Sequence, residues 1–128
     1  MVGRTAKWRS RGASEGAPLL YVEVADTFLR RFLGLIGRKA LAPSHALLIV
    51  PCSGVQMCFM RFAIDVVFLK RREGGESWQV IKVAHKLRPW FGISICRDAD
   101  AVLEMSWGEA KRLGMEAGMI WEEMQHSK

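Results

Sequence analysis

The side chains with the clearest chemical potential in this 128-residue chain lie in one stretch, from Cys52 to Leu69. The stretch reads CSGVQMCFMRFAIDVVFL and contains two of the three cysteines, Cys52 and Cys58. It also contains a single acid, Asp65, within an otherwise apolar run. A carboxylate in such a run needs a partner or a shifted pKa, because burying an unpaired charge is costly. We therefore expect a site in or beside this stretch.

An arginine is the expected partner of Asp65, because a guanidinium can donate to both carboxylate oxygens at once. Arg38, which follows the end of a predicted helix, is the first candidate, and Arg61 and Arg31 are the others. Buried ion pairs with a structural role outnumber catalytic ones. We therefore favour a pair that fixes a helix to the sheet, with a functional pocket as the alternative.

The cysteines do not follow the usual pattern of a zinc site, in which two cysteines are separated by two to four residues and matched by a second pair. Cys52 and Cys58 have a wider gap, and His45 and His85 lie far away in the sequence. The pattern favours core thiols, with no metal and no cofactor. The alternative is a Cys52 nucleophile assisted by His85, which requires the two side chains to meet in the fold.

Cysteine content and hydrophobic patterning also indicate a location. Three cysteines do not make a disulfide framework, and thiols persist in a reducing compartment. No apolar run approaches the length needed to span a bilayer, and no secretory signal is evident. We expect a cytoplasmic protein without a membrane span.

A loop predicted over residues 86–96 contains adjacent aromatic side chains, Trp90 and Phe91, close to Arg88. Exposed aromatics beside an arginine can stack a sugar ring, a base or a peptide. The alternative is a loop folded over one end of the core, because tryptophan is seldom fully exposed.

The net charge of +6 is unevenly placed, since half of it lies within residues 1–18. This segment has no apolar period, and we interpret it as a flexible basic leader. The remaining excess is spread along the chain, so nucleic acid is an unlikely partner. The run Lys70–Arg72 is interpreted as a solvated hairpin edge.

The pattern of apolar residues predicts one β-rich domain over residues 19–124, followed by a polar tail over 125–128. In the run from Ile64 to Lys70, Asp65 shares one face with Val67 and Leu69. Strands are predicted over 19–24, 46–50, 55–60, 64–70, 78–85, 101–105 and 119–124, and helices over 26–37 and 106–113, the second opened by a capping box of Ser106 and Glu109. The predicted fold class is mainly β with two short helices (α+β), forming a compact antiparallel β-sandwich or jelly-roll-like barrel.

Several motifs resemble one known family, the bacterial and archaeal domain of unknown function 192. The resemblance covers residues 20–124. Its motifs are VEVADT at Val22–Thr27, LLIVPC at Leu47–Cys52, FMRFAIDVVFL at Phe59–Leu69 and Val-Leu-Glu at Val102–Glu104. It implies a small β-sandwich or jelly-roll-like fold and no particular reaction. The chain has Gln56 and Met57 where many members have a His-Thr pair, which argues against a mechanism that needs an imidazole there.

The sequence therefore favours a small non-catalytic binding or accessory domain with a pocket around Cys52–Leu69, taking up a small molecule, a glycan or a protein partner. It lacks a Gly-rich phosphate loop, a serine elbow, a zinc pair and an acid dyad. The expected binding residues are Arg38, Cys52, Gln56, Arg61, Asp65 and Trp90. One alternative is a hydrolase or transferase that uses Asp65 or Cys52, and another is a nucleic-acid or anionic-surface binder that uses the basic tail.

Overall fold

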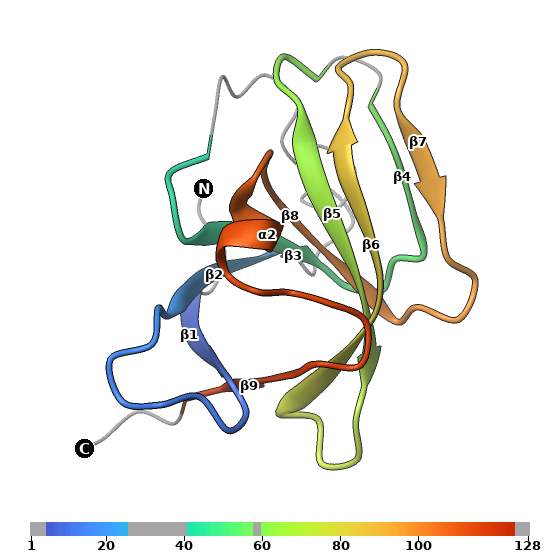
Figure 1. Cartoon of the computed structure of the whole chain (residues 1–128). Coiled ribbons are helices and arrows are strands. Elements are labelled where there is room, and N and C mark those ends of the chain that lie inside the picture. Colours follow the sequence, from blue (N-terminus) through green and yellow to red (C-terminus); the bar gives the residue numbers. More distant parts are fainter. Residues whose placement is uncertain (1–4, 26–40, 58–59, 125–128) are drawn as a thin grey trace.

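The fold was determined as a computed structural model, which describes residues 5–25, 41–57 and 60–124 (Figure 1). The main sheet consists of β1 (Thr5–Ser10), β2 (Leu20–Ala25), β3 (His45–Ile49), β5 (Ile64–Arg71), β6 (Ser77–Leu87), β8 (Ala101–Ser106) and β9 (Ile120–Glu123). A second sheet consists of β4 (Gly54–Gln56) and β7 (Ile93–Ile95), and a short helix, α2 (Glu109–Arg112), follows β8.

The main sheet closes into a barrel with the strand order β1-β2-β3-β8-β5-β6-β9, in which β9 pairs with β1. All neighbouring strands are antiparallel except β2 and β3, which run parallel. Closure leaves no unpaired edge in the main sheet. The structure therefore confirms the mainly β class and the barrel, whereas the sandwich and the wholly antiparallel arrangement are not found.

Alternation along each strand separates two apolar clusters. On β5, Val67 and Leu69 face the barrel interior, while Val66 and Phe68 face outward. The inner cluster comprises Ala6, Trp8, Leu20, Val22, Val24, Ala46, Leu48, Val67, Leu69, Trp78, Val80, Ala101, Leu103, Met105, Ala110, Leu113, Met115 and Trp121. Because both faces of β5 are buried from Val66 to Leu69, this part of the strand is a continuous apolar run without polar alternation.

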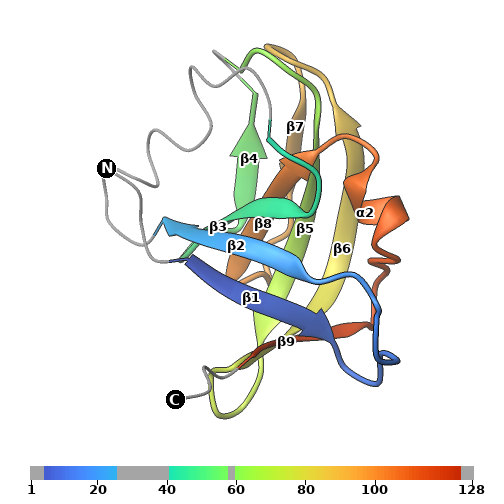
Figure 2. The same ribbon diagram turned by 90° about the vertical axis from the view of Figure 1, so that its left-hand side faces the viewer.

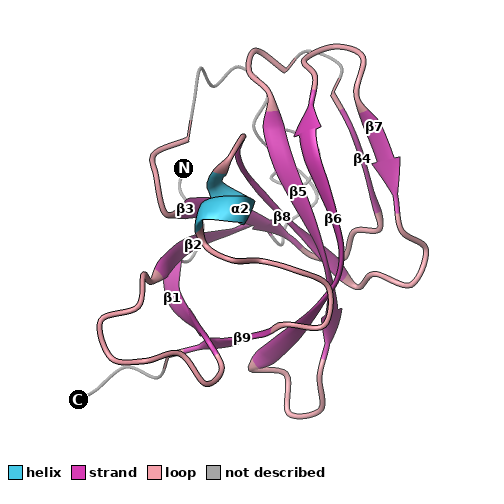
Figure 3. Cartoon of the chain, viewed as in Figure 1, coloured by secondary structure: helices cyan, strands magenta, loops and turns pink. Residues whose placement is uncertain are grey.

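The small β4–β7 sheet covers part of the outer face of the barrel. Val55 of β4 and the following Met57 join the outer cluster with Val66 and Phe68. Figure 3 shows β4 and β7 as a separate layer beside β6, with β7 at the outer edge. The sequence prediction placed β7 in a loop, because a strand of three residues with exposed side chains has no recognisable apolar face.

The helix α2 closes one end of the barrel, where Ala110, Leu113 and Met115 join the inner cluster. Figure 2 shows α2 at the end of the barrel toward which β1 runs. The predicted capping box is wrong. Gly108 is the N-cap residue, in a left-handed conformation with φ 94°, and the Ser106 hydroxyl instead contacts the backbone of Leu41. The helix predicted over 26–37 lies outside the described residues, and no described helix has the length and apolarity to cross a bilayer.

The expectation of a flexible leader over residues 1–18 is wrong for β1, which pairs with β2 and β9 and completes the barrel. Trp8 is only 2% exposed and its ring stacks on Trp78, with 6.0 Å between the ring centroids. Along β1, the buried Ala6 and Trp8 alternate with exposed residues, which is the pattern of a strand with one buried face. The boundaries proposed for the domain and the polar tail stay predictions.

We predict that Trp8→Ala lowers the free energy of unfolding by about 3–5 kcal/mol, because it leaves a cavity in the inner cluster and removes the stacking on Trp78. Urea denaturation gives the measurement. Lys7→Ala, an exposed position on the same strand, is the control and should change stability by less than about 0.5 kcal/mol. A comparable small effect for both variants would mean that β1 does not contribute to the folded core.

Candidate functional site

The strand β5 carries a charged side chain at each end of the barrel. Asp65 and Arg71 have the same parity as the inward-facing Val67 and Leu69. Six residues of strand separate the two by about 20 Å. Asp65 lies at the end closed by α2, and Arg71 lies at the opposite end, which we call the barrel mouth.

The carboxylate of Asp65 is fully buried and accepts three backbone hydrogen bonds. Its Oδ1 accepts from the N–H of Lys86 at 2.9 Å. Its Oδ2 accepts from the N–H groups of Gly108 at 2.9 Å and Ala110 at 3.1 Å. Asp65 therefore supplies, from a distant strand, the cap that the start of α2 lacks.

This arrangement differs from the expected ion pair with an arginine. The partners of Asp65 are backbone amides, and Arg61 is exposed without an ion pair to Asp65. Arg38 and Arg31 lie outside the described residues. Three charge-assisted hydrogen bonds satisfy a buried carboxylate without a counter-ion, so Asp65 has a structural role at the closed end.

We predict that Asp65→Asn lowers the free energy of unfolding by roughly 2–4 kcal/mol. If the amide oxygen faces α2, the amide nitrogen faces the N–H of Lys86, and a buried donor is left unsatisfied. Denaturant melts of both proteins provide the test. Asp98→Asn, in an exposed loop, is the matched control with the same change of charge. A loss below about 1 kcal/mol for Asp65→Asn would contradict the structural role.

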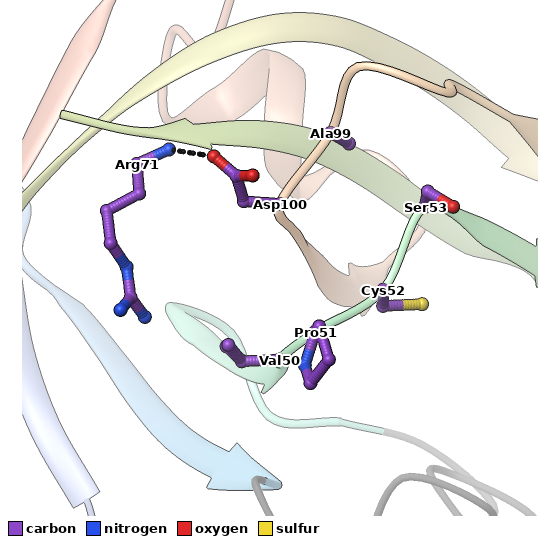
Figure 4. A pocket seen from close by; sticks show the side chains of 7 residues that line it. All are labelled: Val50, Pro51, Cys52, Ser53, Arg71, Ala99 and Asp100. Atoms are coloured by element: carbon purple, nitrogen blue, oxygen red, sulfur yellow. Dashed lines mark hydrogen bonds between the residues drawn. The ribbon is translucent and has the colours of Figure 1, made fainter.

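At the barrel mouth, the guanidinium carbon of Arg71 lies 4.6 Å from the centroid of the Trp78 ring. Arg71 lines two cavities. The larger, of about 490 Å³, is also lined by Val50, Pro51, Cys52, Ser53, Ala99 and Asp100 (Figure 4). The smaller, of about 100 Å³, extends into the barrel and is also lined by Ala6, Trp8, Val24, Leu48, Val50, Gly75, Trp78 and Glu123. Arg71 and Val50 thus belong to both.

The nearest acid is already engaged by other groups. Oδ2 of Asp100 accepts a hydrogen bond from the backbone N–H of Arg71 at 2.8 Å, and its Oδ1 lies 3.8 Å from Nζ of Lys70. In the described part of the chain, no carboxylate forms an ion pair with the guanidinium of Arg71. Its N–H donors can therefore serve an anionic ligand.

Cys52 is half-buried in the wall of the larger cavity, and its Sγ donates to the carbonyl oxygen of Gly54 at 3.1 Å. No histidine lines this cavity among the described residues. The described residues also contain no group of three or more His, Cys, Asp or Glu side chains placed to hold a metal ion.

Of the expected binding residues whose side chains the structure describes, one, Cys52, lies at the barrel mouth. Asp65 lies at the opposite end, and Trp90 and Arg61 are not among the lining residues. Arg38 and the side chain of Gln56 lie outside the described set.

Sequence reasoning missed Arg71 and Asp100. Arg71 was interpreted as part of a solvated edge, and both Lys70 and Arg71 are indeed exposed, but the spacing of Arg71 from Val67 and Leu69 also places it on the side of β5 that faces the barrel interior. That parity is the signal that could have identified it. Asp100 precedes β8 and has no distinguishing pattern in the sequence.

A second buried acid lies on the outer face of the barrel. Glu104 of β8 is 5% exposed, and its neighbours across the sheet are Leu47 and Val66. Its Oε1 has no hydrogen-bond partner. Burial raises the pKa of the Glu104 carboxyl from 4.5 to about 7. Glu104 belongs to the Val-Leu-Glu motif, and no feature of that motif indicates a carboxyl that is buried without a partner.

We predict that Glu104 makes the protein less stable as the pH rises. Because its pKa is raised in the folded state, this contribution to stability is fully present below about pH 4.5 and is lost as the pH rises through about 7. The loss amounts to about 3 kcal/mol. Denaturant melts at several pH values from about 5 to about 8 should show this loss of stability. The variant Glu104→Gln should not lose stability in this way. Parallel pH profiles for the two proteins would contradict the prediction.

Comparison with known proteins supplies a family and a fold. Residues 10–122 match the family model DUF192, described as "Uncharacterized ACR". A UPF0127 protein of Pyrococcus furiosus is 34% identical over 111 residues, which cover 80% of this chain and 88% of that protein.

Two solved structures are similar. One, from Sinorhizobium meliloti and provisionally named a transcription regulator, has a TM-score of 0.81 and 25% identity over 96% of each chain. The other, a protein of unknown function from Novosphingobium aromaticivorans, has a TM-score of 0.75 and 20% identity over 94% of this chain and 86% of that chain. The latter likeness concerns the fold alone.

Proposed function

Because this chain belongs to the DUF192 family, whose function is unknown, its role has to be argued from its own site, and we propose that it is a non-catalytic binding domain whose barrel mouth takes up a small anionic ligand. The observation that carries the proposal is the position of Arg71. Its guanidinium is held against Trp78 between two adjoining cavities, and no described carboxylate pairs with it.

The contact with Trp78 makes Arg71 a preorganised anion site. Cation–π attraction holds the guanidinium against the ring. A side chain that is already positioned loses less conformational entropy when a ligand binds. The planar guanidinium donates two parallel hydrogen bonds to a carboxylate or a phosphate. The net charge of +6 also favours the approach of an anion.

The surrounding side chains favour a ligand that also has an apolar part. Val50 and Pro51 line the larger cavity, and Trp8 and Trp78 line the smaller one. The volume of the larger cavity is within the usual range for small-molecule sites, about 300–1,000 Å³, and barrel mouths are frequent locations for them. A carboxylate attached to a ring or short aliphatic chain combines these features.

The alternatives expected from the sequence have less support. Asp65 is buried and its oxygens are occupied by three amides, which leaves it no role as an acid or base. The basic charges expected to form a binding tail lie largely on or beside β1, where Arg11 pairs with Glu122 at 3.1 Å. Arg9 borders a cavity that is also lined by Glu76, Glu122 and Glu123. This local compensation weakens the case for nucleic-acid binding through that segment. A cytoplasmic location is part of the proposal and is supported by the thiols of Cys52 and Cys96.

We predict that benzoate and indole-3-acetate bind at the mouth and that Arg71→Met weakens their binding at least about tenfold, because a charge-assisted hydrogen bond contributes about 1.5–3 kcal/mol. Methionine retains an apolar contact with Trp78 but cannot donate. Isothermal titration calorimetry is the measurement, because indole-3-acetate carries the same fluorescent ring as Trp8 and Trp78, which line the site. Titration with inorganic phosphate shows whether the site prefers a carboxylate.

Arg72→Met is the matched control. It removes the same charge at the adjacent position, and Arg72 lines neither cavity. It should leave the affinities unchanged. Equal weakening by both variants would show a general charge effect, and the absence of binding by any of these anions to the unmodified chain would contradict the proposal.

A further inference from the structure

Four of the five large apolar side chains that are exposed in the described residues lie within six consecutive positions. They are Trp90, 53% exposed, Phe91, 87%, Ile93, 66%, and Ile95, 57%. We call these four residues the β7 surface. Soluble proteins seldom expose such a concentration of apolar side chains unless it binds something.

The β7 surface is an apolar stripe along one segment of the chain. Ile93 and Ile95 lie on one face of β7, with the more buried Ser94 between them, and Trp90 and Phe91 lie in the turn that precedes the strand. Gly54 pairs with Ile95 across the sheet, where a Cβ on Gly54 would lie 3.4 Å from Cγ1 of Ile95. No side chain of β4 therefore covers Ile95 at this position.

The loop that presents Trp90 and Phe91 is fixed by backbone hydrogen bonds. The N–H of Trp90 donates to the carbonyl of Met57 at 2.8 Å, and the N–H of Met57 donates to the carbonyl of Gly92 at 2.9 Å. A Cβ on Gly92 would lie 2.9 Å from both the backbone nitrogen of Arg88 and Cγ of Met57, so only glycine fits. The surface is preformed, and docking it requires little additional ordering.

The surroundings of this stripe are positively charged. Four exposed cationic side chains and no acid lie on β6 and in the segment from there through Arg97: Lys82, Lys86, Arg88 and Arg97; the exposed Asp98 follows directly. Residues 51–64, which include β4, add Arg61 and again no acid. An apolar stripe with cationic flanks is complementary to an apolar interior beneath an anionic layer.

From this combination we propose that the β7 surface docks onto an anionic lipid bilayer, with Phe91, Ile93 and Ile95 entering the acyl boundary and Arg88 and Arg97 contacting the headgroups. Trp90, which is 53% exposed beside these residues, is of the residue type that is enriched at membrane–water interfaces. The cytoplasmic leaflet carries the required negative charge. This attachment uses a different surface from the barrel mouth and does not depend on ligand binding there.

Two protein occupants fit this surface less well. A partner strand would need backbone groups along the outer edge of β7, but this strand has only three residues and the carbonyl of Ile95 already accepts from Nζ of Lys82 at 2.9 Å. A second copy of the chain would bring Arg88 and Arg97 against identical cationic flanks. A lipid surface requires neither a free strand edge nor a shape-matched groove.

The test is flotation of the full chain with phosphatidylcholine vesicles, prepared with and without phosphatidylglycerol. We expect binding to the anionic vesicles, weaker binding as the salt concentration rises, and little binding to phosphatidylcholine alone. The double variant Phe91→Ser, Ile93→Ser should reduce the partition coefficient at least about tenfold, because it removes two apolar side chains from the contact. Both positions are exposed, and an unchanged Tm would show that folding is intact.

A charge-matched pair of variants separates local from overall charge. Arg88→Gln, Arg97→Gln should weaken partitioning about thirtyfold, at the usual contribution of a cation near an anionic surface. Lys7→Gln, Lys111→Gln removes the same charge from β1 and α2 and should leave partitioning within about threefold of the unmodified chain.

Each remaining outcome overturns the proposal. Failure of the unmodified chain to float with anionic vesicles at low salt excludes a membrane-docking role and leaves an acidic protein as the occupant. Equal weakening by the two charge pairs would assign binding to net charge alone. A dimer in sedimentation velocity that is dissociated by Phe91→Ser, Ile93→Ser would assign the β7 surface to a second copy.

Discussion

The carboxylate of Asp65 determines the arrangement of the closed end of the barrel. Its three hydrogen bonds join β5 to backbone positions 21, 43 and 45 residues away, at the end of β6 and at the start of α2. The helix is only one turn long and would not persist alone. Held by Asp65, it places Ala110 and Leu113 over the barrel interior, so this end is filled by the chain itself.

Sealing of one end makes the other end the natural place for a ligand. The inward-facing row of β5 continues from Asp65 through Val67 and Leu69 to Arg71, and only the last of these reaches the cavities. Asp65 pairs with amides, whereas Arg71 has an aromatic ring beneath it and no described counter-ion. One strand thus has a charged group that closes the fold at one end and a charged group that can receive a ligand at the other.

A feature could be predicted from the sequence where residues close together in the chain cause it, and not where the fold brings distant groups together. The central strands were predictable because β5 and β8 carry long apolar runs, whereas β1 was not, because Trp8 is the only large apolar residue among its charged neighbours. That Asp65 needs a partner follows from its surroundings in the sequence. Its partners are backbone amides, which have no sequence signature, so only the fold reveals them. Arg71 could have been identified from its spacing to Val67 and Leu69 along the strand, whereas no sequence pattern identifies Asp100.

The barrel mouth and the β7 surface are distinct, but one short segment connects them. Cys52 lines the larger cavity, and its N–H donates to the carbonyl of Asp100 at 3.1 Å. Ser53 lines the same cavity, and its carbonyl accepts from the N–H of Cys96, next to β7, at 2.8 Å. The wall of the cavity is therefore also the start of the β4–β7 sheet. Movement of that sheet relative to the barrel would change the shape of the cavity, because the intervening residues are hydrogen-bonded to both.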